Sequence, residues 1–364
     1  MALVPRKIRA LDPYQAGKPI EEVKREYGIE HVIKLASNEN PQGPPQSAIA
    51  AANAALSSCH RYPDPSGYAL RTKLAQRFRV KLENVIHGAG SEGIMSTIMR
   101  TFLLDDDEII TAAGSFIGFR VLAEAAGNIV HWVNMKDYRY DLAAMAEQIN
   151  DYTKIIYIAN PDNPTGSHVT TAEFDEFMTH VPDRVLVILD EAYFEYAQAT
   201  SDYPDSMHYR YDNVITLRTF SKVYGLAGLR VGYGFAHETL IGNLFKVKLP
   251  FEMSIPAQAA ALAALDDDAY LQRSLDINRA GMALYEKTFT DWGIRYVPSV
   301  TNFITIVFDA PEVATDFSQK MLKEGVIVRP LGGFRQPNCV RITIGLSEEN
   351  NFCLKAMENV LKDR

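Results

Sequence analysis

The stretch "TFSKVYGLAGLRVGYG", from Thr219 to Gly234, decides how the fold of this chain is interpreted. It places one lysine, Lys222, behind two hydroxyl residues and ahead of a glycine-rich run that contains a second cation, Arg230. An amine held among apolar groups and near another cation loses proton affinity and can become a nucleophile toward carbonyl compounds. A structural lysine fits the same pattern, so the rest of the chain must separate the two interpretations.

Segments that read as strands and helices alternate around this stretch. Short runs rich in Val and Ile predict buried strands at 84–88, 108–113, 129–133, 154–160, 184–192, 213–220 and 230–236. Helical spacing predicts helices at 68–78, 91–103, 119–127, 141–149 and 171–179. Strand and helix in alternation predict an α/β fold whose mostly parallel sheet is covered on both faces.

The sequence changes in character after about Pro256. A long helical stretch covers 257–291, and "DDD" at 266–268 interrupts it. Three strand-like runs follow ("NFITIVF", "GVIVRPL" and "CVRITIG"), with helices at 312–324 and 347–361. We therefore expect a large domain at 46–255 and a smaller α+β domain at 256–364. Residues 1–45 are expected to form an N-terminal arm and part of the small domain.

Composition and charge argue against several classes of protein. Of the 364 residues, 47% are hydrophobic and 23% are charged, and the formal net charge is −8. This is the balance of an ordinary globular protein without the basic stripe of a nucleic-acid binder. Cys59, Cys339 and Cys353 lie far apart, which predicts neither a disulfide framework nor a metal site. The first residues lack a signal peptide's apolar core, and no apolar run approaches the ~20 residues of a membrane span, so we expect a soluble cytoplasmic protein.

Polar side chains follow several of the predicted strands. The run "KIIYIAN" leads into "PDNPTG" with Asn163, "RVLVILDEAY" ends on Asp190 and Tyr193, and "VITLRTFSK" ends on Lys222. In an open parallel sheet, ligands bind beyond the carboxyl ends of the strands. Asp190 follows a run of apolar residues, so its carboxylate is expected to be buried. It then needs a partner, because a buried charge is costly unless it is paired. A helix cap or a structural ion pair would satisfy Asp190 equally well.

The loop "GAGSEG" at 88–93 matches the G-x-G-x-x-G pattern of dinucleotide-binding folds. Such a fold needs an acidic residue at the end of the next strand, but "EIITAAG" ends in Ala-Gly. We interpret the loop as a cradle for a single phosphate, in which backbone N–H groups at a helix N-terminus face the anion. The alternative is a tight strand–helix turn without a ligand.

One ligand would use all of these features, namely pyridoxal 5'-phosphate. Its aldehyde needs a lysine for a Schiff base, its ring nitrogen needs a carboxylate, and its phosphate needs N–H groups, hydroxyls and an arginine. Across nearly its whole length, the chain resembles fold-type I pyridoxal-phosphate aminotransferases, and among them the class II histidinol-phosphate aminotransferase family. The resemblance rests on motifs in a fixed order: "LDPYQAGKPI", "KLASNENPQGP", "RYPDPSG", "GAGSEGI", "NPDNPTG", "LDEAYFEY", "TFSKVYGLAGLRVGYG" and "GVIVRPLGGF" through "VRITIG".

The resemblance implies a seven-stranded large-domain sheet and roles around the cofactor. Lys222 would carry the cofactor and shuttle the proton, Asp190 would pair with the ring nitrogen, and Tyr193 would join them as the third catalytic residue. Asn163 and Tyr193 would bond the ring's phenolic oxygen, and Phe116 would stack on the ring. The phosphate would be held by Gly90, Ser91 and Glu92 through their backbone, by Thr219, Ser221 and Arg230, and by Tyr62 across the interface of a homodimer with shared sites.

The same resemblance implies the substrate end of the pocket. Arg341 would clamp the α-carboxylate of glutamate or 2-oxoglutarate, and Arg329 a substrate phosphate or distal carboxylate. Tyr14 and Asn38 are also expected to line the pocket. We expect Arg335 to be solvated. At 113–119 the sequence departs from the family's Pro-Thr-aromatic run, and Gly114 and Ser115 are expected to loosen that loop.

Several activities fit this scaffold. The first is ping-pong transamination between histidinol phosphate and 2-oxoglutarate, a step of histidine biosynthesis. The second is an aromatic amino-acid aminotransferase, because Tyr14, Phe116 and Phe119 would suit any flat ring. A threonine-phosphate decarboxylase is a third, from a similar family. A pyridoxal-phosphate-sensing regulator would need a basic helix-turn-helix, which the sequence does not show, and a dehydrogenase would need more than the "GAGSEG" loop. We expect small-molecule substrates and no nucleic acid, membrane or metal.

Overall fold

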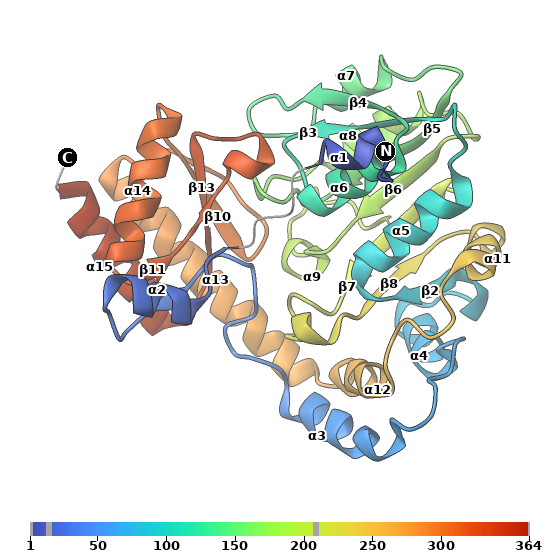
Figure 1. The fold of residues 1–364 in the computed structure, drawn as a ribbon, viewed down its shortest axis with the longest axis horizontal. Coiled ribbons are helices and arrows are strands. Elements are labelled where there is room, and N and C mark those ends of the chain that lie inside the picture. Colours follow the sequence, from blue (N-terminus) through green and yellow to red (C-terminus); the bar gives the residue numbers. More distant parts are fainter. Residues whose placement is uncertain (1–2, 12–16, 207–210, 363–364) are drawn as a thin grey trace.

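A seven-stranded sheet forms the centre of the computed structural model, which describes residues 3–11, 17–206 and 211–362 (Figure 1). Its strand order is β2-β8-β7-β6-β5-β3-β4. The strands are β2 (Val85–Gly88), β3 (Glu108–Ala113), β4 (Ile129–Asn134), β5 (Thr153–Ala159), β6 (Leu186–Asp190), β7 (Val214–Thr219) and β8 (Gly232–Phe235). Strands β3 to β7 pair in parallel, and β8 is antiparallel to both of its neighbours. The predicted α/β fold with a mostly parallel sheet is confirmed.

Helices cover both faces of this sheet. Helices α5 (Gly90–Phe102), α6 (Ile117–Ala126) and α11 (Glu238–Val247) share one hydrophobic cluster with it, and α7 (Leu142–Ala146) and α8 (Thr171–Met178) share another. Strand β5 shows why both faces of the sheet need to be covered by helices. Its Ile155 and Tyr157 lie in the first cluster and its Ile156 and Ile158 in the second, since successive side chains of a strand point to opposite faces.

The small domain combines a four-stranded sheet with long helices. The order of that sheet is β12-β13-β10-β9. Its strands are β9 (Tyr296–Val297), β10 (Phe303–Val307), β12 (Arg329–Pro330) and β13 (Cys339–Thr343), and its core includes α14 (Pro311–Lys323) and α15 (Ser347–Lys362). Strand β1 (Ile33–Lys34) pairs in parallel with β11 (Val326–Ile327), so part of the N-terminal segment joins this domain.

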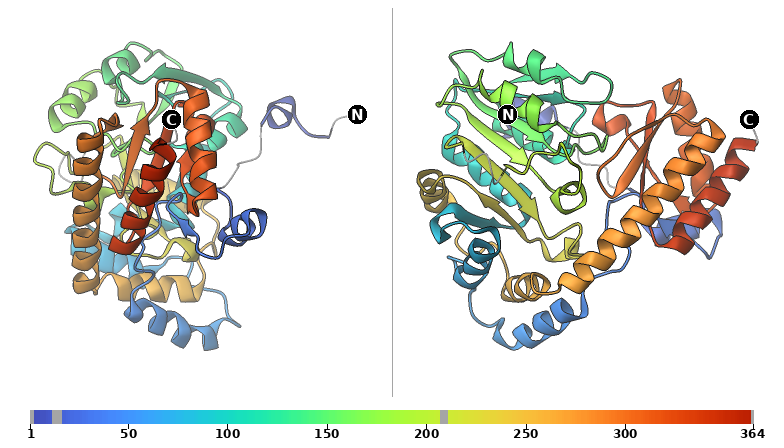
Figure 2. Two further views of the ribbon diagram at one scale, coloured as in Figure 1. Left: turned by 90° about the vertical axis from the view of Figure 1, so that its left-hand side faces the viewer. Right: turned by 180° about the vertical axis from the view of Figure 1, so that it is seen from behind.

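The helices between the domains refine the expected domain division. Helix α12 (Ile255–Ala264) packs on α3 (Gln46–Ala55), and its buried alanines share a cluster with residues of α4 (Tyr68–Phe78). Helix α13 (Asp268–Trp292) runs from the large domain into the small one, where its second half joins the core (Figure 2). The division at residue 256 stays a proposal, and this packing favours a boundary inside α13.

The remaining elements are short. They are α1 (Arg6–Arg9), α2 (Ile20–Tyr27), α9 (Phe194–Ala197), and the 3-10 turns η1 (Leu56–Ser58), η2 (Leu82–Asn84), η3 (Ala227–Leu229) and η4 (Gly332–Phe334). Helix α1 contacts α6 of the same chain, where Lys7 Nζ donates a hydrogen bond to the Ala126 carbonyl at 2.5 Å. Within the described ranges, none of the helices combines the length and apolarity that crossing a membrane requires.

Candidate active site

A cleft of about 560 Å³ opens beyond the carboxyl ends of β5, β6 and β7. Ten of the twelve residues expected to bind the cofactor line it: Ser91, Glu92, Phe116, Asn163, Asp190, Tyr193, Thr219, Ser221, Lys222 and Arg230. They come from five separate segments of the sequence, and the parallel sheet brings the strand ends to one edge. The other two are Gly90, which lies directly before Ser91, and Tyr62, which lies elsewhere.

Lys222 follows β7 by three residues and lines the cleft. Burial lowers the pKa of its amine to about 8, and the positive charge of Arg341 adds to the effect, ahead of that of Arg230. The lysine Nζ lies 5.6 Å from the ring centroid of Tyr193. A larger fraction of this amine is therefore neutral near pH 7 than of a solvated lysine, as a nucleophile requires.

Asp190, the last residue of β6, offers one satisfied and one unsatisfied oxygen. Its Oδ2 accepts a hydrogen bond from the Tyr157 hydroxyl at 2.8 Å. Its Oδ1 is buried and accepts no hydrogen bond from any described residue. Burial raises the pKa of this carboxyl to about 7. A buried acceptor without a hydrogen bond is costly, so this oxygen at the wall of the cleft indicates a ligand that donates a hydrogen bond to it.

The start of α5 and the turn before β8 form a tight cradle. Gly90 has a φ of +73°, and a Cβ atom there would lie 2.6 Å from Arg230 Nη2. A Cβ atom on Gly232 would lie 2.4 Å from the Ser91 amide nitrogen, so both positions require glycine. Arg230 Nη1 lies 3.3 Å from Ser221 Oγ, which in turn accepts a hydrogen bond from the Thr219 hydroxyl at 3.0 Å. Amides, hydroxyls and a guanidinium around one space suit a phosphate.

The residues expected to bind the substrate, Asn38, Arg329 and Arg341, do not themselves line this cleft, but Asn38 and Arg341 contact two residues that do. Arg341 Nη2 donates a hydrogen bond to the Ala36 carbonyl at 2.9 Å, and its Nη1 bonds Asn163 Oδ1. Asn38 Nδ2 donates a hydrogen bond to the Tyr193 hydroxyl at 2.8 Å. Asn38 itself is held by Thr343, next but one to Arg341 on β13.

Arg329 lies beside Arg341, because these two residues are paired across β12 and β13. It is buried, and its guanidinium lies 5.6 Å from the ring centroid of Phe334. Tyr14, which was also expected to bind the substrate, lies outside the described residues. Phe119, expected to offer a flat apolar surface, does not line the cleft: its side chain is buried against Tyr157.

The expectation that Gly114 and Ser115 loosen their loop is wrong. Gly114 does adopt a φ of +100°, which favours glycine, but its carbonyl accepts a hydrogen bond from Gln336 Nε2 at 3.0 Å. Ser115 is buried, donates to Asp162 Oδ1 at 2.6 Å and accepts from the Tyr140 hydroxyl at 2.7 Å. The loop is therefore tied to both domains, and it holds Phe116 at the cleft.

Arg335 and Tyr62 both lie away from this cleft. The Arg335 guanidinium lies 4.7 Å from the ring centroid of Trp132 and 3.8 Å from the Glu124 carboxylate. Its side chain rests on the large domain and remains 44% exposed. Tyr62 has 78% of its surface exposed, and its ring stacks on that of Phe251 with centroids 4.4 Å apart.

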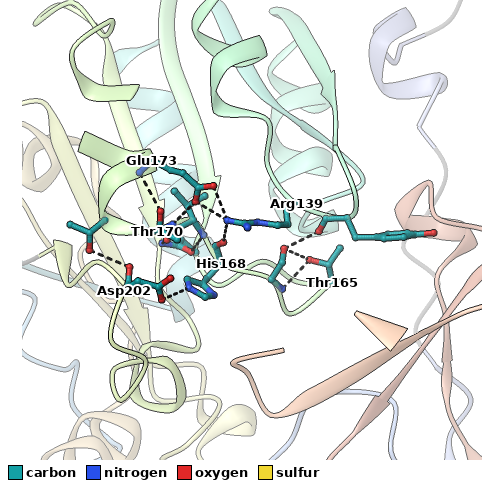
Figure 3. Close-up of polar contacts among 11 residues, drawn as sticks. Arg139, Thr165, His168, Thr170, Glu173 and Asp202 are labelled. Carbon is teal, nitrogen blue, oxygen red and sulfur yellow. Dashed lines mark hydrogen bonds and ion pairs between the residues drawn. The ribbon is translucent and has the colours of Figure 1, made fainter. Parts of the chain in front are cut away.

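A polar network holds the chain between Thr165 and Glu173, as Figure 3 shows. Arg139 Nη2 donates to Glu173 Oε2 at 2.7 Å and to the His168 carbonyl at 3.0 Å. Thr170 and Glu173 form a capping box at the start of α8, and His168 Nε2 lies 2.9 Å from Asp202 Oδ1. This network supports the segment from outside and contributes no residue to the lining of the cleft.

The family model for aminotransferase class I and II matches residues 30–354 of the chain. The chain belongs to the class I and II aminotransferases. Histidinol-phosphate aminotransferase 1 of Nitrosococcus oceani is 42% identical over 358 residues, which cover 98% of this aminotransferase and 96% of that protein. Histidinol-phosphate aminotransferase of Anaeromyxobacter is 43% identical over 364 residues, 99% of this chain and 100% of that one.

Solved structures agree with the fold of this aminotransferase. The crystal structure of histidinol-phosphate aminotransferase from Sinorhizobium meliloti in complex with pyridoxal-5'-phosphate superposes with a TM-score of 0.91 at 27% identity, covering 100% of this chain and 98% of that one. Aspartate aminotransferase from Thermus thermophilus superposes with a TM-score of 0.85 at 22% identity, covering 100% of both chains, which supports the fold alone. The predicted fold-type I architecture is confirmed.

Sequence reasoning missed Tyr157 and the trio of Ser115, Tyr140 and Asp162. All four side chains are buried in or beside the core. From the sequence alone, residues at such positions are interpreted as contributing to core packing. A signal for Tyr157 exists in "KIIYIAN", because a phenol in an otherwise apolar strand needs a hydrogen-bond partner. The identity of that partner follows only from the pairing of β5 with β6.

Proposed function

We propose that this aminotransferase uses pyridoxal 5'-phosphate to transfer an amino group from histidinol phosphate to 2-oxoglutarate by ping-pong chemistry. The proposal rests first on Asp190, whose unsatisfied Oδ1 shares a cleft with the lysine amine of Lys222 and with an anion cradle. The near-full-length similarity to histidinol-phosphate aminotransferases supports it.

The residues of the cleft fit the cofactor. Its ring nitrogen would meet Asp190 Oδ1, and its aldehyde carbon would meet Lys222. Its phosphate would occupy the cradle of Ser91, Glu92 and Arg230, together with Thr219 and Ser221. Glycines 90 and 232 leave the space that the phosphate needs, since a Cβ at either position would collide with the cradle itself.

When bound, the cofactor supplies an electron sink that stabilises negative charge on the substrate's amine-bearing carbon. The chain supplies the rest. The Lys222 amine, with its lowered pKa, is placed to take and return a proton on one side of the cleft. Asn163 and Tyr193 would orient the ring edge, and Phe116 would cover one face. Asp190 remains ionised when it is paired with a cationic ring nitrogen.

Two arginines are proposed to recognise the substrates. Arg341 would bind the α-carboxylate of glutamate and 2-oxoglutarate, a role for which its bidentate guanidinium is suited. Histidinol phosphate has no carboxylate, so Arg329, one strand away, would bind its phosphate. Tyr14 and Asn38 complete the proposed pocket, Asn38 through its hydrogen bond to Tyr193.

A panel of amino donors with 2-oxoglutarate tests this specificity. The purified protein would be assayed with histidinol phosphate, histidine, phenylalanine, tyrosine and threonine phosphate. We expect the highest kcat/KM with histidinol phosphate. A preference for phenylalanine or tyrosine would replace the proposal by an aromatic aminotransferase, and release of carbon dioxide from threonine phosphate would indicate the decarboxylase.

We also propose that the protein works as a cytoplasmic homodimer with shared sites. Tyr62 and Phe251 form an exposed aromatic pair, and Leu249, two residues before Phe251, is also exposed. Exposed apolar side chains of this kind suit burial against a second copy. In that dimer Tyr62 would reach the partner's phosphate cradle, and the N-terminal arm would pack on the partner.

Mixed dimers test the shared site. Each active site of the proposed dimer would use Lys222 from one subunit and Tyr62 from the other. A hybrid of a Tyr62→Phe subunit and a Lys222→Ala subunit therefore has one site with both residues intact. We expect the mixture, after exchange of subunits, to be more active than either variant alone. A fully active monomer in light scattering would contradict the dimer.

A further inference from the structure

Tyr157 lies in the middle of β5, beneath the floor of the cleft. It is fully buried, and its hydroxyl donates a hydrogen bond to Asp190 Oδ2 at 2.8 Å. The pairing of β5 with β6 sets Ala159 opposite Asp190, two residues further along than Tyr157. Both side chains therefore point to the same face of the sheet, and the phenol reaches the carboxylate from the side away from the strand ends.

The Tyr157 ring has little freedom to move. The ring of Phe119 stacks on it with centroids 3.8 Å apart and planes at 7°. The Tyr157 carbonyl accepts a hydrogen bond from the Thr111 hydroxyl of the neighbouring strand at 3.1 Å. Phe119 belongs to α6, whose N-cap residue is Phe116 at the cleft. One helix thus fixes both the aromatic residue at the cleft and the clamp behind Asp190.

This contact leaves one carboxylate oxygen of Asp190 for a ligand. Tyr157 occupies Oδ2 and leaves Oδ1 as the buried acceptor without a hydrogen bond among the described residues. It also favours the ionised form of a carboxyl whose pKa is raised, first by burial and further by the negative charges of Glu92 and Glu191. The amide of Ala192 acts in the same direction as Tyr157, and the negative charge of Asp190 in turn raises the pKa of Lys222, against the lowering effect of burial.

We propose that Tyr157 is a positioning residue, which holds the Asp190 carboxylate ionised and turned so that Oδ1 meets the ring nitrogen of pyridoxal phosphate. The inference rests on the proposed cofactor. If the inference is right, the Tyr157 hydroxyl affects cofactor binding only by way of the contact between Asp190 and the ring nitrogen.

The test measures cofactor affinity rather than turnover. Tyr157→Phe removes the hydroxyl and keeps the ring that stacks on Phe119. We expect pyridoxal phosphate to bind this variant about tenfold more weakly, because a hydrogen bond to a charged group is lost. A deaza analogue, in which carbon replaces the ring nitrogen, should bind the variant and the wild type equally.

Two further variants make the result decisive. In an Asp190→Asn background, Tyr157→Phe should cost no further affinity, since the two residues act as one unit. Tyr233→Phe is the matched control: Tyr233 is fully buried in the same sheet, and its hydroxyl has no hydrogen bond among the described residues. This control should bind the cofactor as the wild type does.

Each alternative result overturns the inference. Equal losses for the cofactor and its deaza analogue would show that the hydroxyl acts on packing, and a loss that persists beside Asp190→Asn would show that it acts elsewhere. Should Tyr157→Phe fail to fold, Phe119→Leu loosens the clamp and must then show the same dependence on the ring nitrogen. A wild type that binds no pyridoxal phosphate would refute the proposed function instead.

Discussion

The cofactor end of the site and its proposed substrate end are built in different ways. At the cofactor end, Asp190, Lys222 and Arg230 lie within 41 residues of sequence. Asp190 ends β6, and Lys222 comes three residues after the neighbouring strand β7. At the substrate end, Arg341 bonds the carbonyl of Ala36, and these residues are 305 positions apart. The first end is a local consequence of strand order, whereas the second exists only when the small domain and the N-terminal segment dock on the large domain.

Because of this difference, substitutions at one end of the site should affect one property of the enzyme and leave the other unchanged. The cofactor end is buried among strands whose neighbours are fixed, so a change there should alter chemistry without altering docking. The substrate end depends on hydrogen bonds between domains, such as that from Asn38 to Tyr193. A change there should alter the recognition of substrates and leave cofactor binding intact.

Replacing Asp190 at the cofactor end should have the largest effect. Asp190→Asn keeps the shape of the side chain and removes the charge that is proposed to pair with the ring nitrogen. A buried charge interaction of about 3 kcal/mol corresponds to a loss of roughly a hundredfold in kcat. Steady-state kinetics measure the loss, and circular dichroism checks the fold. Turnover close to that of the wild type would exclude this role for Asp190.

Arg329→Lys should have the next largest effect, confined to the substrate end. Lysine keeps the charge and loses the fork that binds phosphate or carboxylate bidentately, which should cost about 2–3 kcal/mol of binding for histidinol phosphate and glutamate. Phenylalanine, which has no distal charge, should be affected little. Arg335→Lys is the matched control, because Arg335 lies over Trp132 and outside the cleft. If both charged substrates bind the Arg329 variant normally, another residue recognises them.

A still smaller effect is expected where the two domains meet. Gln336→Ala removes the hydrogen bond from a buried side chain to the Gly114 carbonyl. Loss of about 1 kcal/mol should raise KM for both substrates several-fold, because the loop before Phe116 is no longer held by the small domain. The affinity for the cofactor, measured by fluorescence titration, should fall less than the affinity for substrates, because Ser115 still ties the loop to Asp162 and Tyr140. A larger loss for the cofactor than for the substrates would mean that the two ends are not separable.

The sequence allowed most of the cofactor end to be predicted. Val- and Ile-rich runs located the strands of the large sheet, and polar residues at their carboxyl ends had to meet at one edge. Asn163, Asp190 and Lys222 therefore lie where the motifs predicted. The glycine-rich loop was interpreted as a phosphate cradle, which stays a prediction; the structure shows a tight helix start there, since Gly90 and Gly232 have no room for a side chain.

The remaining features depend on contacts that no local pattern encodes. The docking of Gln336 on Gly114 and the hydrogen bonds of Ser115 reversed the expectation of a loose loop. Tyr157 reads as core in the sequence, and its role follows from the register between two strands. Phe119 carries an aromatic ring but packs away from the cleft, because helical spacing alone does not tell which side of α6 faces a ligand.

Chemical trapping of the cofactor tests the central claim, that this cleft is a pyridoxal-phosphate site centred on Lys222. The purified protein would be reduced with borohydride, digested, and its peptides mapped by mass spectrometry. We expect one stoichiometric pyridoxyl group, on the peptide that contains Lys222, and none in Lys222→Ala. A pyridoxyl group on a different lysine, or a wild-type protein that takes up no cofactor, would contradict it.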